Sequence, residues 1–173
     1  RIAALAVAAG QLETAVDGGR PYGGALDGLM ALADGEEAIR TAASTLGAWS
    51  KTGVPTVADL SRRFADMAPK LTAPAAAQPG GDWTDLLRAK ALSLVKMRPV
   101  GEAGESSPIT RAERALARGD LAAAVTALDG MPGPAGPWLA SARNRLAADA
   151  ATAAVRARIA ERLAAESRAA SGG

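Results

Sequence analysis

The stretch that decides the fold is GDLAAAVTAL at residues 119–128, together with WLASAR at residues 138–143. A glycine can end one helix, an aspartate can cap the next, and a helix headed by tryptophan then begins. The stretch therefore predicts a helical hairpin that packs on a third helix. Such an arrangement is typical of an interaction scaffold and not of a catalytic site.

The composition of the rest of the chain favours the same kind of structure. The 173 residues are enough for one domain with a hydrophobic core. Hydrophobic residues make up 49% of the chain and aromatic residues only 3%, so the core must form where small-residue helix faces approach closely. We predict an all-α bundle of about six to eight helices whose C-terminal part is a helical hairpin of the tetratricopeptide type.

The residue types that are missing exclude much chemistry. The chain has no histidine and no cysteine, which removes the commonest general base, the thiol nucleophile and the usual zinc ligands. We therefore expect no enzyme activity, no catalytic residue, no cofactor and no metal site. A net charge of +2 is too small to predict a nucleic-acid-binding surface.

The ends of the chain bear on where the protein resides. No run approaches the roughly 20 apolar residues that a membrane span needs, and residues 1–16 lack the basic start of a signal peptide. The amphipathic pattern already begins at Arg1. We therefore expect a piece of a longer protein, with any membrane anchor or targeting signal upstream.

Helical periodicity and turn residues predict one domain in two halves. Residues 1–72 form an N-terminal helical half, residues 73–81 a linker rich in proline and glycine, residues 82–166 a C-terminal helical half, and residues 167–173 a flexible polar tail. The predicted helices cover residues 1–16, a short segment after residue 22, residues 36–52, 57–71, 82–98, 108–118 and 121–128, and a last segment from about 136 to 165.

The helix at residues 57–71 has the most regular apolar stripe. Its members are spaced three and four apart, and the preceding Thr56 and Asp59 match the capping pattern of a helix start. We expect the stripe to be buried. It consists of Val57, Leu60, Phe64, Met67 and Leu71.

The last helix has two apolar faces. Leu139 and Leu146 share one side, whereas Val155, Ile159 and Leu163 lie on another. Either the helix breaks between residues 147 and 154, or its second half offers the latter three side chains to another chain or another segment. We expect Val155, Ile159 and Leu163 to mediate self-association or to hold a segment that is missing from this chain.

The same helix is basic. Arg156, Arg158 and Arg162 could make weak, salt-sensitive contacts with anionic lipid headgroups. The alternative is a solvated polar face, because the arginines are spread around the helix and do not form one stripe.

Three segments of the chain resemble the mitofilin family of mitochondria and alphaproteobacteria. They are the glycine-valine turn with the helix that follows it, the hairpin, and the tryptophan-headed helix. The matching positions are Val54, Leu60, Arg63, Phe64, Gly119, Asp120, Leu121, Trp138 and Arg143.

The resemblance implies a function in membrane organisation. It implies that the full protein has an N-terminal anchor in the inner membrane, a coiled coil and lipid-binding helices, with this domain on the periplasmic or intermembrane-space side. The domain would form homo-oligomers and dock protein partners of the inner and outer membranes. A second reading of the same helices is a periplasmic tetratricopeptide-like adaptor that binds a protein or peptide and has no role in membrane curvature.

Overall fold

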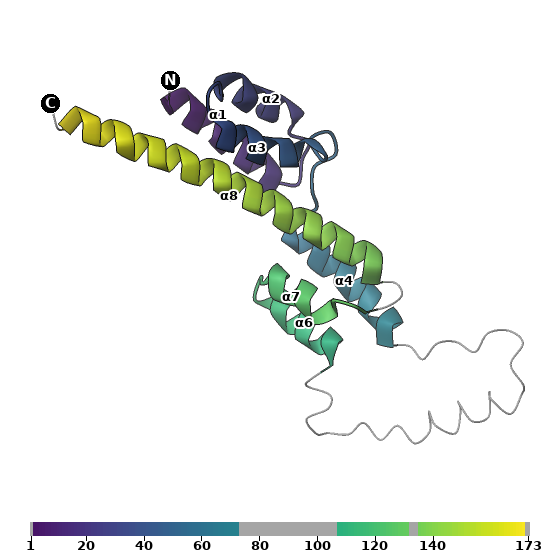
Figure 1. The fold of residues 1–173 in the computed structure, drawn as a ribbon. Coiled ribbons are helices and arrows are strands. Elements are labelled where there is room, and N and C mark those ends of the chain that lie inside the picture. Colours follow the sequence, from purple (N-terminus) through teal and green to yellow (C-terminus); the bar gives the residue numbers. More distant parts are fainter. Residues whose placement is uncertain (1, 73–106, 132–134, 172–173) are drawn as a thin grey trace, which may run out of the picture. The chain divides into compact units, whose positions relative to one another are not determined.

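The computed structural model is all-α and confirms the predicted fold class (Figure 1). It describes residues 2–72, 107–131 and 135–171. These ranges contain seven helices and no strand: α1 (Ile2–Asp17), α2 (Gly23–Leu32), α3 (Glu37–Gly47), α4 (Val57–Thr72), α6 (Pro108–Ala117), α7 (Leu121–Leu128) and α8 (Ala135–Ser171). The linker predicted at residues 73–81 and the helix predicted at 82–98 lie outside the described residues.

The chain divides into two compact units. Unit 1 consists of Arg1–Leu60 and Ala140–Gly173, and unit 2 of Ser61–Leu139. The sequence analysis placed the C-terminal helices together after the linker. In the structure, most of α8 belongs instead with the first three helices.

The core of unit 1 lies where α1, α2 and α3 face the middle part of α8 (Figure 1). Large aliphatic side chains of the first three helices meet alanines and two β-branched residues of α8, as the scarcity of aromatic residues requires. The largest contributors are Leu5, Leu12, Val16, Leu26, Leu29, Ile39, Leu46, Val155 and Ile159. Burial of these side chains supplies the main driving force for folding of unit 1.

Backbone turns fix how the first three helices connect. Gly19 and Gly53 both have positive φ, at 65° and 76°, and the two residues approach closely in space. The hydroxyl of the buried Tyr22 donates to the carbonyl oxygen of Leu46 at 2.9 Å. The start of α2 is thereby tied to the end of α3.

Helix α4 begins with the predicted cap. The Thr56 hydroxyl accepts from the Asp59 backbone N–H at 3.1 Å, and the Asp59 carboxylate accepts from the Thr56 backbone N–H at 3.3 Å. This reciprocal pair is a capping box. On the predicted stripe, Leu60 and Phe64 are buried, whereas Val57, Met67 and Leu71 are half-buried.

In unit 2, α6 and α7 pack on each other as the predicted hairpin. Ser107 caps α6 by accepting from the Thr110 N–H at 3.1 Å, and Asp120 caps α7 by accepting from the Ala123 N–H at 2.9 Å. Gly119, between the helices, has φ 74°, a conformation that glycine adopts without steric cost. The hairpin prediction is therefore confirmed in its boundaries and in its capping residues.

Helix α8 runs without a break from Ala135 to Ser171. The break considered between residues 147 and 154 is therefore absent. The helix also continues through residues 167–171, where the sequence predicted a flexible tail. None of the described helices is both long enough and apolar enough to cross a membrane.

Candidate functional site

The second apolar face of α8 is a core face and not a free surface. Val155 and Ile159 are 2% and 5% exposed and pack among residues of α1, α2 and α3. The expectation that they face another chain is therefore wrong for these two residues, because the segment that they hold is the N-terminal part of the same chain. Leu163, one turn further, is 41% exposed.

The arginines of α8 that were expected to contact lipid make ion pairs within unit 1. Arg158 Nε donates to Glu36 Oε2 at 2.9 Å, and Arg162 Nε lies 3.2 Å from Glu36 Oε1. Arg156 pairs with Glu13 of α1. These pairs give the three arginines a structural role that the sequence analysis did not assign.

The Glu36 carboxylate is the shared partner of two of these arginines. Its side chain is only 11% exposed. Hydrogen bonds from Arg158 to Glu36, and then to Glu161, raise the pKa of Arg158. The pairs with Glu36 hold the start of α3 against α8.

Arg145 is the buried charged residue that the sequence analysis overlooked. Its guanidinium donates to the carbonyl oxygen of Val16 at 2.9 Å and to Asp17 Oδ1 at 2.9 Å, and it also pairs with Asp149 one turn along α8. The i, i+4 spacing of Arg145 and Asp149 is visible in the sequence. The contact between Arg145 and the end of α1 is not visible in the sequence, because it joins segments far apart along the chain.

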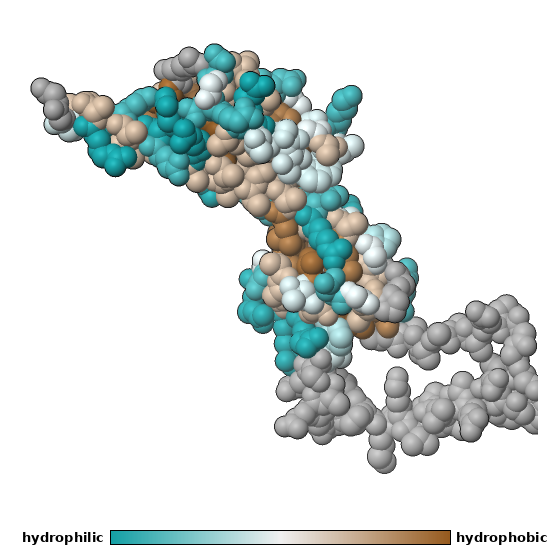
Figure 2. Space-filling view, viewed as in Figure 1, coloured by the Kyte–Doolittle hydropathy of each residue, from teal (hydrophilic) through white to brown (hydrophobic). Residues whose placement is uncertain are grey.

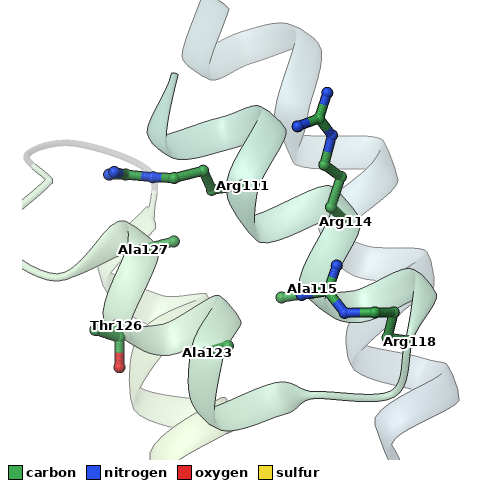
Figure 3. A pocket seen from close by; sticks show the side chains of 7 residues that line it. All are labelled: Arg111, Arg114, Ala115, Arg118, Ala123, Thr126 and Ala127. Atoms are coloured by element: carbon green, nitrogen blue, oxygen red, sulfur yellow. The ribbon is translucent and has the colours of Figure 1, made fainter. Parts of the chain in front are cut away.

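Unit 2 contains a groove between α6 and α7, with a volume of about 610 Å³ (Figure 3). Three arginines of α6 lie along one side, and small residues line the rest. Figure 3 shows Arg111 and Arg118 extending over the groove toward α7, whereas Arg114 points away from α7. The lining residues are Arg111, Arg114, Ala115, Arg118, Ala123, Thr126 and Ala127.

The arginines at the groove differ from those of α8 in their ion pairs. Within the described residues, the side chains of Arg111 and Arg118 make no ion pair, and both residues are exposed. Figure 2 shows hydrophilic side chains over the α6–α7 hairpin, interleaved with less polar ones. The groove therefore combines cationic groups at its edge with an apolar floor of alanine methyl groups.

The other residues that carry the family resemblance have structural positions. Val54 and Leu60 are buried in unit 1. In unit 2, the rings of Phe64 and Trp138 meet edge to face, with 5.3 Å between their centroids. Leu121 is buried in the hairpin, and Arg63 and Arg143 are exposed.

Nothing in the described ranges is arranged as a metal site. No group of three or more carboxylates there is placed to hold a metal ion. The described carboxylates of Glu13, Asp17, Glu36, Asp120 and Asp149 each pair with an arginine or cap a helix.

Comparison with known proteins identifies the family. The mitofilin family, described as "Mitochondrial inner membrane protein", matches residues 1–159. A curated relative is "Probable magnetosome protein Mms36" of Magnetospirillum gryphiswaldense (strain MSR-1), 36% identical over an alignment of 154 residues that covers 83% of this chain and 43% of that protein. The chain thus spans less than half of that relative's length. No solved structure shows significant similarity to the chain. Because the family match covers most of the sequence, the chain belongs to the mitofilin family.

Proposed function

We propose that this chain is a non-enzymatic docking and self-association domain of a membrane-shaping protein, held on the periplasmic side of the inner membrane. The observation that carries the proposal is the open α6–α7 groove, at which Arg111 and Arg118 have no ion-pair partner among the described residues. Cations that a folded protein leaves unpaired beside a concave surface are available to a partner. Protein partners of the inner and outer membranes are the expected ligands.

The structure of unit 1 supports a scaffold role for the remaining helices. Their buried apolar residues and their ion pairs connect α1 and α3 to α8, and no group of three or more carboxylates placed to hold a metal lies among the described residues. A stable helical frame of this kind presents binding surfaces without chemistry of its own. Family membership supports the membrane setting.

Modest contacts are sufficient for such a role when many copies share one membrane. Tethering raises the effective concentration of each domain, so weak contacts between copies, or with a partner, add up to strong association. The domain would in this way stabilise curved regions of the inner membrane and connect them to outer-membrane proteins.

The second candidate function is a periplasmic adaptor. The α6–α7 hairpin with its groove favours this candidate, because a groove between paired helices suits a bound peptide whether or not the protein shapes membranes. The two candidates differ in what happens to the membrane when the domain is lost.

Electron cryotomography of cells that make the full-length protein tests the two candidates. We expect deletion of residues 1–171 to abolish curved inner-membrane structures while the remainder of the protein stays in the membrane. Cross-linking in the same cells should show loss of the protein's higher-order species. Unchanged membrane shape with loss of a cross-linked partner would favour the adaptor, and unchanged membranes with unchanged cross-links would refute both candidates.

A further inference from the structure

Four arginines of α8 differ in their ion pairs from two arginines at the groove. In unit 1, Arg145, Arg156, Arg158 and Arg162 all pair with carboxylates. In unit 2, Arg111 and Arg118 flank the groove and pair with none of the described carboxylates. Within the described part of the chain, the charges at the groove therefore stabilise no contact between helices through an ion pair.

The spacing of the two arginines defines what they can hold. They are seven positions apart, Arg111 within α6 and Arg118 at its C-cap, which is two helical turns or roughly 10 Å along the helix axis. An extended peptide in the polyproline II conformation advances about 3.1 Å per residue and completes a turn in three residues, so its side chains three positions apart lie on the same face and span a similar length. Two carboxylates at that separation could each accept hydrogen bonds from one guanidinium.

The floor of the groove determines which other groups of a ligand can fit. It is formed by Ala115 of α6 and by Ala123, Thr126 and Ala127 of α7 (Figure 3). Short side chains leave room for backbone and small apolar groups of a ligand. A volume of about 610 Å³ lies within the range of small-molecule sites, and because the groove is open, a longer ligand could continue beyond it.

We propose that the α6–α7 groove binds an acidic peptide segment of a protein partner, in extended conformation, with two carboxylates about three residues apart on Arg111 and Arg118. The inference rests on the proposed docking function and names the chemistry of the partner. Charge complementarity identifies the occupant. An extended acidic segment supplies carboxylates for Arg111 and Arg118, and its narrow backbone fits over the alanines of the floor.

The shape of the site favours a peptide over a membrane surface. A bilayer offers its anionic headgroups on a surface that is broad compared with a protein groove, and it meets protruding faces of a protein more readily than a hollow between two helices. A peptide can enter the hollow and contact the alanines of its floor. The membrane is therefore an outcome of the test and not the proposal.

Fluorescence anisotropy with a labelled, end-blocked alanine peptide that carries two glutamates three positions apart tests the proposal on the whole 173-residue chain. We expect binding that weakens as salt is added. The double variant Arg111→Gln/Arg118→Gln should bind about tenfold more weakly, the loss expected from two exposed charge contacts. The variant Ala127→Leu, which fills the floor and changes no charge, should also bind more weakly.

Two controls separate the groove from general attraction. The double variant Arg40→Gln/Lys51→Gln removes the same charge from exposed positions of unit 1 and should bind as the parent does. A peptide with glutamine in place of both glutamates should not bind. Circular dichroism of each variant confirms that the helices are intact.

Equal binding by the parent and the Arg111→Gln/Arg118→Gln variant, with helices intact, would overturn the inference. Loss of binding to phosphatidylglycerol vesicles by that variant, without peptide binding by the parent, would assign the groove to lipid and would also overturn it. Different results would refute the inference and the proposed function. Peptide binding with unchanged membranes in the deletion experiment refutes membrane shaping alone, whereas altered membranes without peptide binding refute the acidic peptide alone.

Discussion

Arg145 donates a hydrogen bond from Nη1 to the carbonyl oxygen of Val16 at 2.9 Å, although 129 positions separate the two residues in sequence. The last carbonyl groups of a helix have no partner within the helix, and the Val16 carbonyl lies in the last turn of α1. A cation at a helix C-terminus also interacts favourably with the helix dipole. The Arg145 side chain of α8 thus supplies a hydrogen bond to the end of α1 and fixes the position of α8 against α1.

Replacing Arg145 should therefore destabilise unit 1. The Arg145 side chain is 8% exposed, and Arg145→Ala leaves the Val16 carbonyl with the Gly19 N–H as its one remaining donor and Asp17 and Asp149 without their cation. We expect a loss of about 3 kcal/mol in the free energy of unfolding, at the lower end for a broken buried pair because both carboxylates can rehydrate. Urea unfolding followed by circular dichroism measures it. Arg168→Gln, at an exposed position of the same helix, should change stability by less than about 0.5 kcal/mol.

The sequence predicts the elements of this protein well because their signals are local. The caps at Ser107 and Asp120 and the reciprocal pair of Thr56 and Asp59 act within one helical turn, so residue types three positions apart reveal them. The hairpin at residues 119–128 is visible for the same reason. An apolar stripe at helical spacing likewise identified Leu60 and Phe64 as buried.

The sequence could not show which helix faces meet. Val155 and Ile159 have the periodicity of an interface, and an interface within the chain gives the same pattern as one between chains. Arg158 has a local partner in Glu161, but the partners that join Arg156, Arg158 and Arg162 to the N-terminal part of the chain lie more than 100 positions away and leave no local trace. The groove was missed because Arg111 and Arg118 become neighbours of α7 only after the hairpin closes.

Gly53 should tolerate no side chain. A Cβ atom there would lie 2.5 Å from the Gly19 carbonyl oxygen and 2.8 Å from that of Arg20, and the φ of 76° disfavours residues with a Cβ. We expect Gly53→Ala to cost more than about 2 kcal/mol, because backbone cannot move aside as a flexible side chain can. Thermal unfolding provides the measurement.

Gly28 is the matched control for that substitution. It lies inside α2, and a Cβ there would meet nothing within 4 Å. Gly28→Ala should raise stability by about 0.5 to 1 kcal/mol through its better helix propensity. A melting temperature that falls equally in both variants would show that the close approach of Gly53 to Gly19 is not what matters.

Phe64 should be essential for unit 2. The side chain is 2% exposed, and its ring meets that of Trp138 edge to face. We expect Phe64→Ala to cost about 3 to 5 kcal/mol, the usual effect of emptying an aromatic core site. Phe64→Leu, which keeps most of the volume, should cost clearly less. An unchanged melting temperature and near-ultraviolet circular dichroism spectrum of Phe64→Ala would place the ring outside the core.

Tyr22 should make stability depend on alkaline pH. Desolvation by burial raises the pKa of its hydroxyl above the ordinary value of 10.0. Since the folded pKa is the higher one, the contribution of Tyr22 is present in full below pH 10 and is lost as pH rises toward the folded value. Tyr22→Phe, which lacks the hydrogen bond to Leu46, should be less stable by about 1 kcal/mol at pH 7.

A comparison of the parent with Tyr22→Phe across pH isolates the contribution of the Tyr22 hydroxyl to stability. Lysines and arginines titrate alike in both proteins, so the difference between their unfolding free energies reports Tyr22 alone. We expect that difference to shrink above pH 10. A difference that stays constant from pH 7 to pH 11 would contradict the raised pKa.

Pairing within unit 1 should limit how strongly this chain binds anionic membranes. The Glu36 carboxylate engages both Arg158 and Arg162, so Glu36→Gln removes the charge that holds them. We expect Glu36→Gln to bind phosphatidylglycerol vesicles at least about fivefold more strongly in low salt, since each basic group near an anionic surface contributes roughly 1 kcal/mol and the substitution affects two such groups. Co-sedimentation with vesicles measures the change. Glu37→Gln alters the net charge equally at an exposed position that pairs with no described arginine, so it should have a smaller effect. Equal gains in the two variants would show that total charge, and not the release of Arg158 and Arg162, controls the contact with lipid.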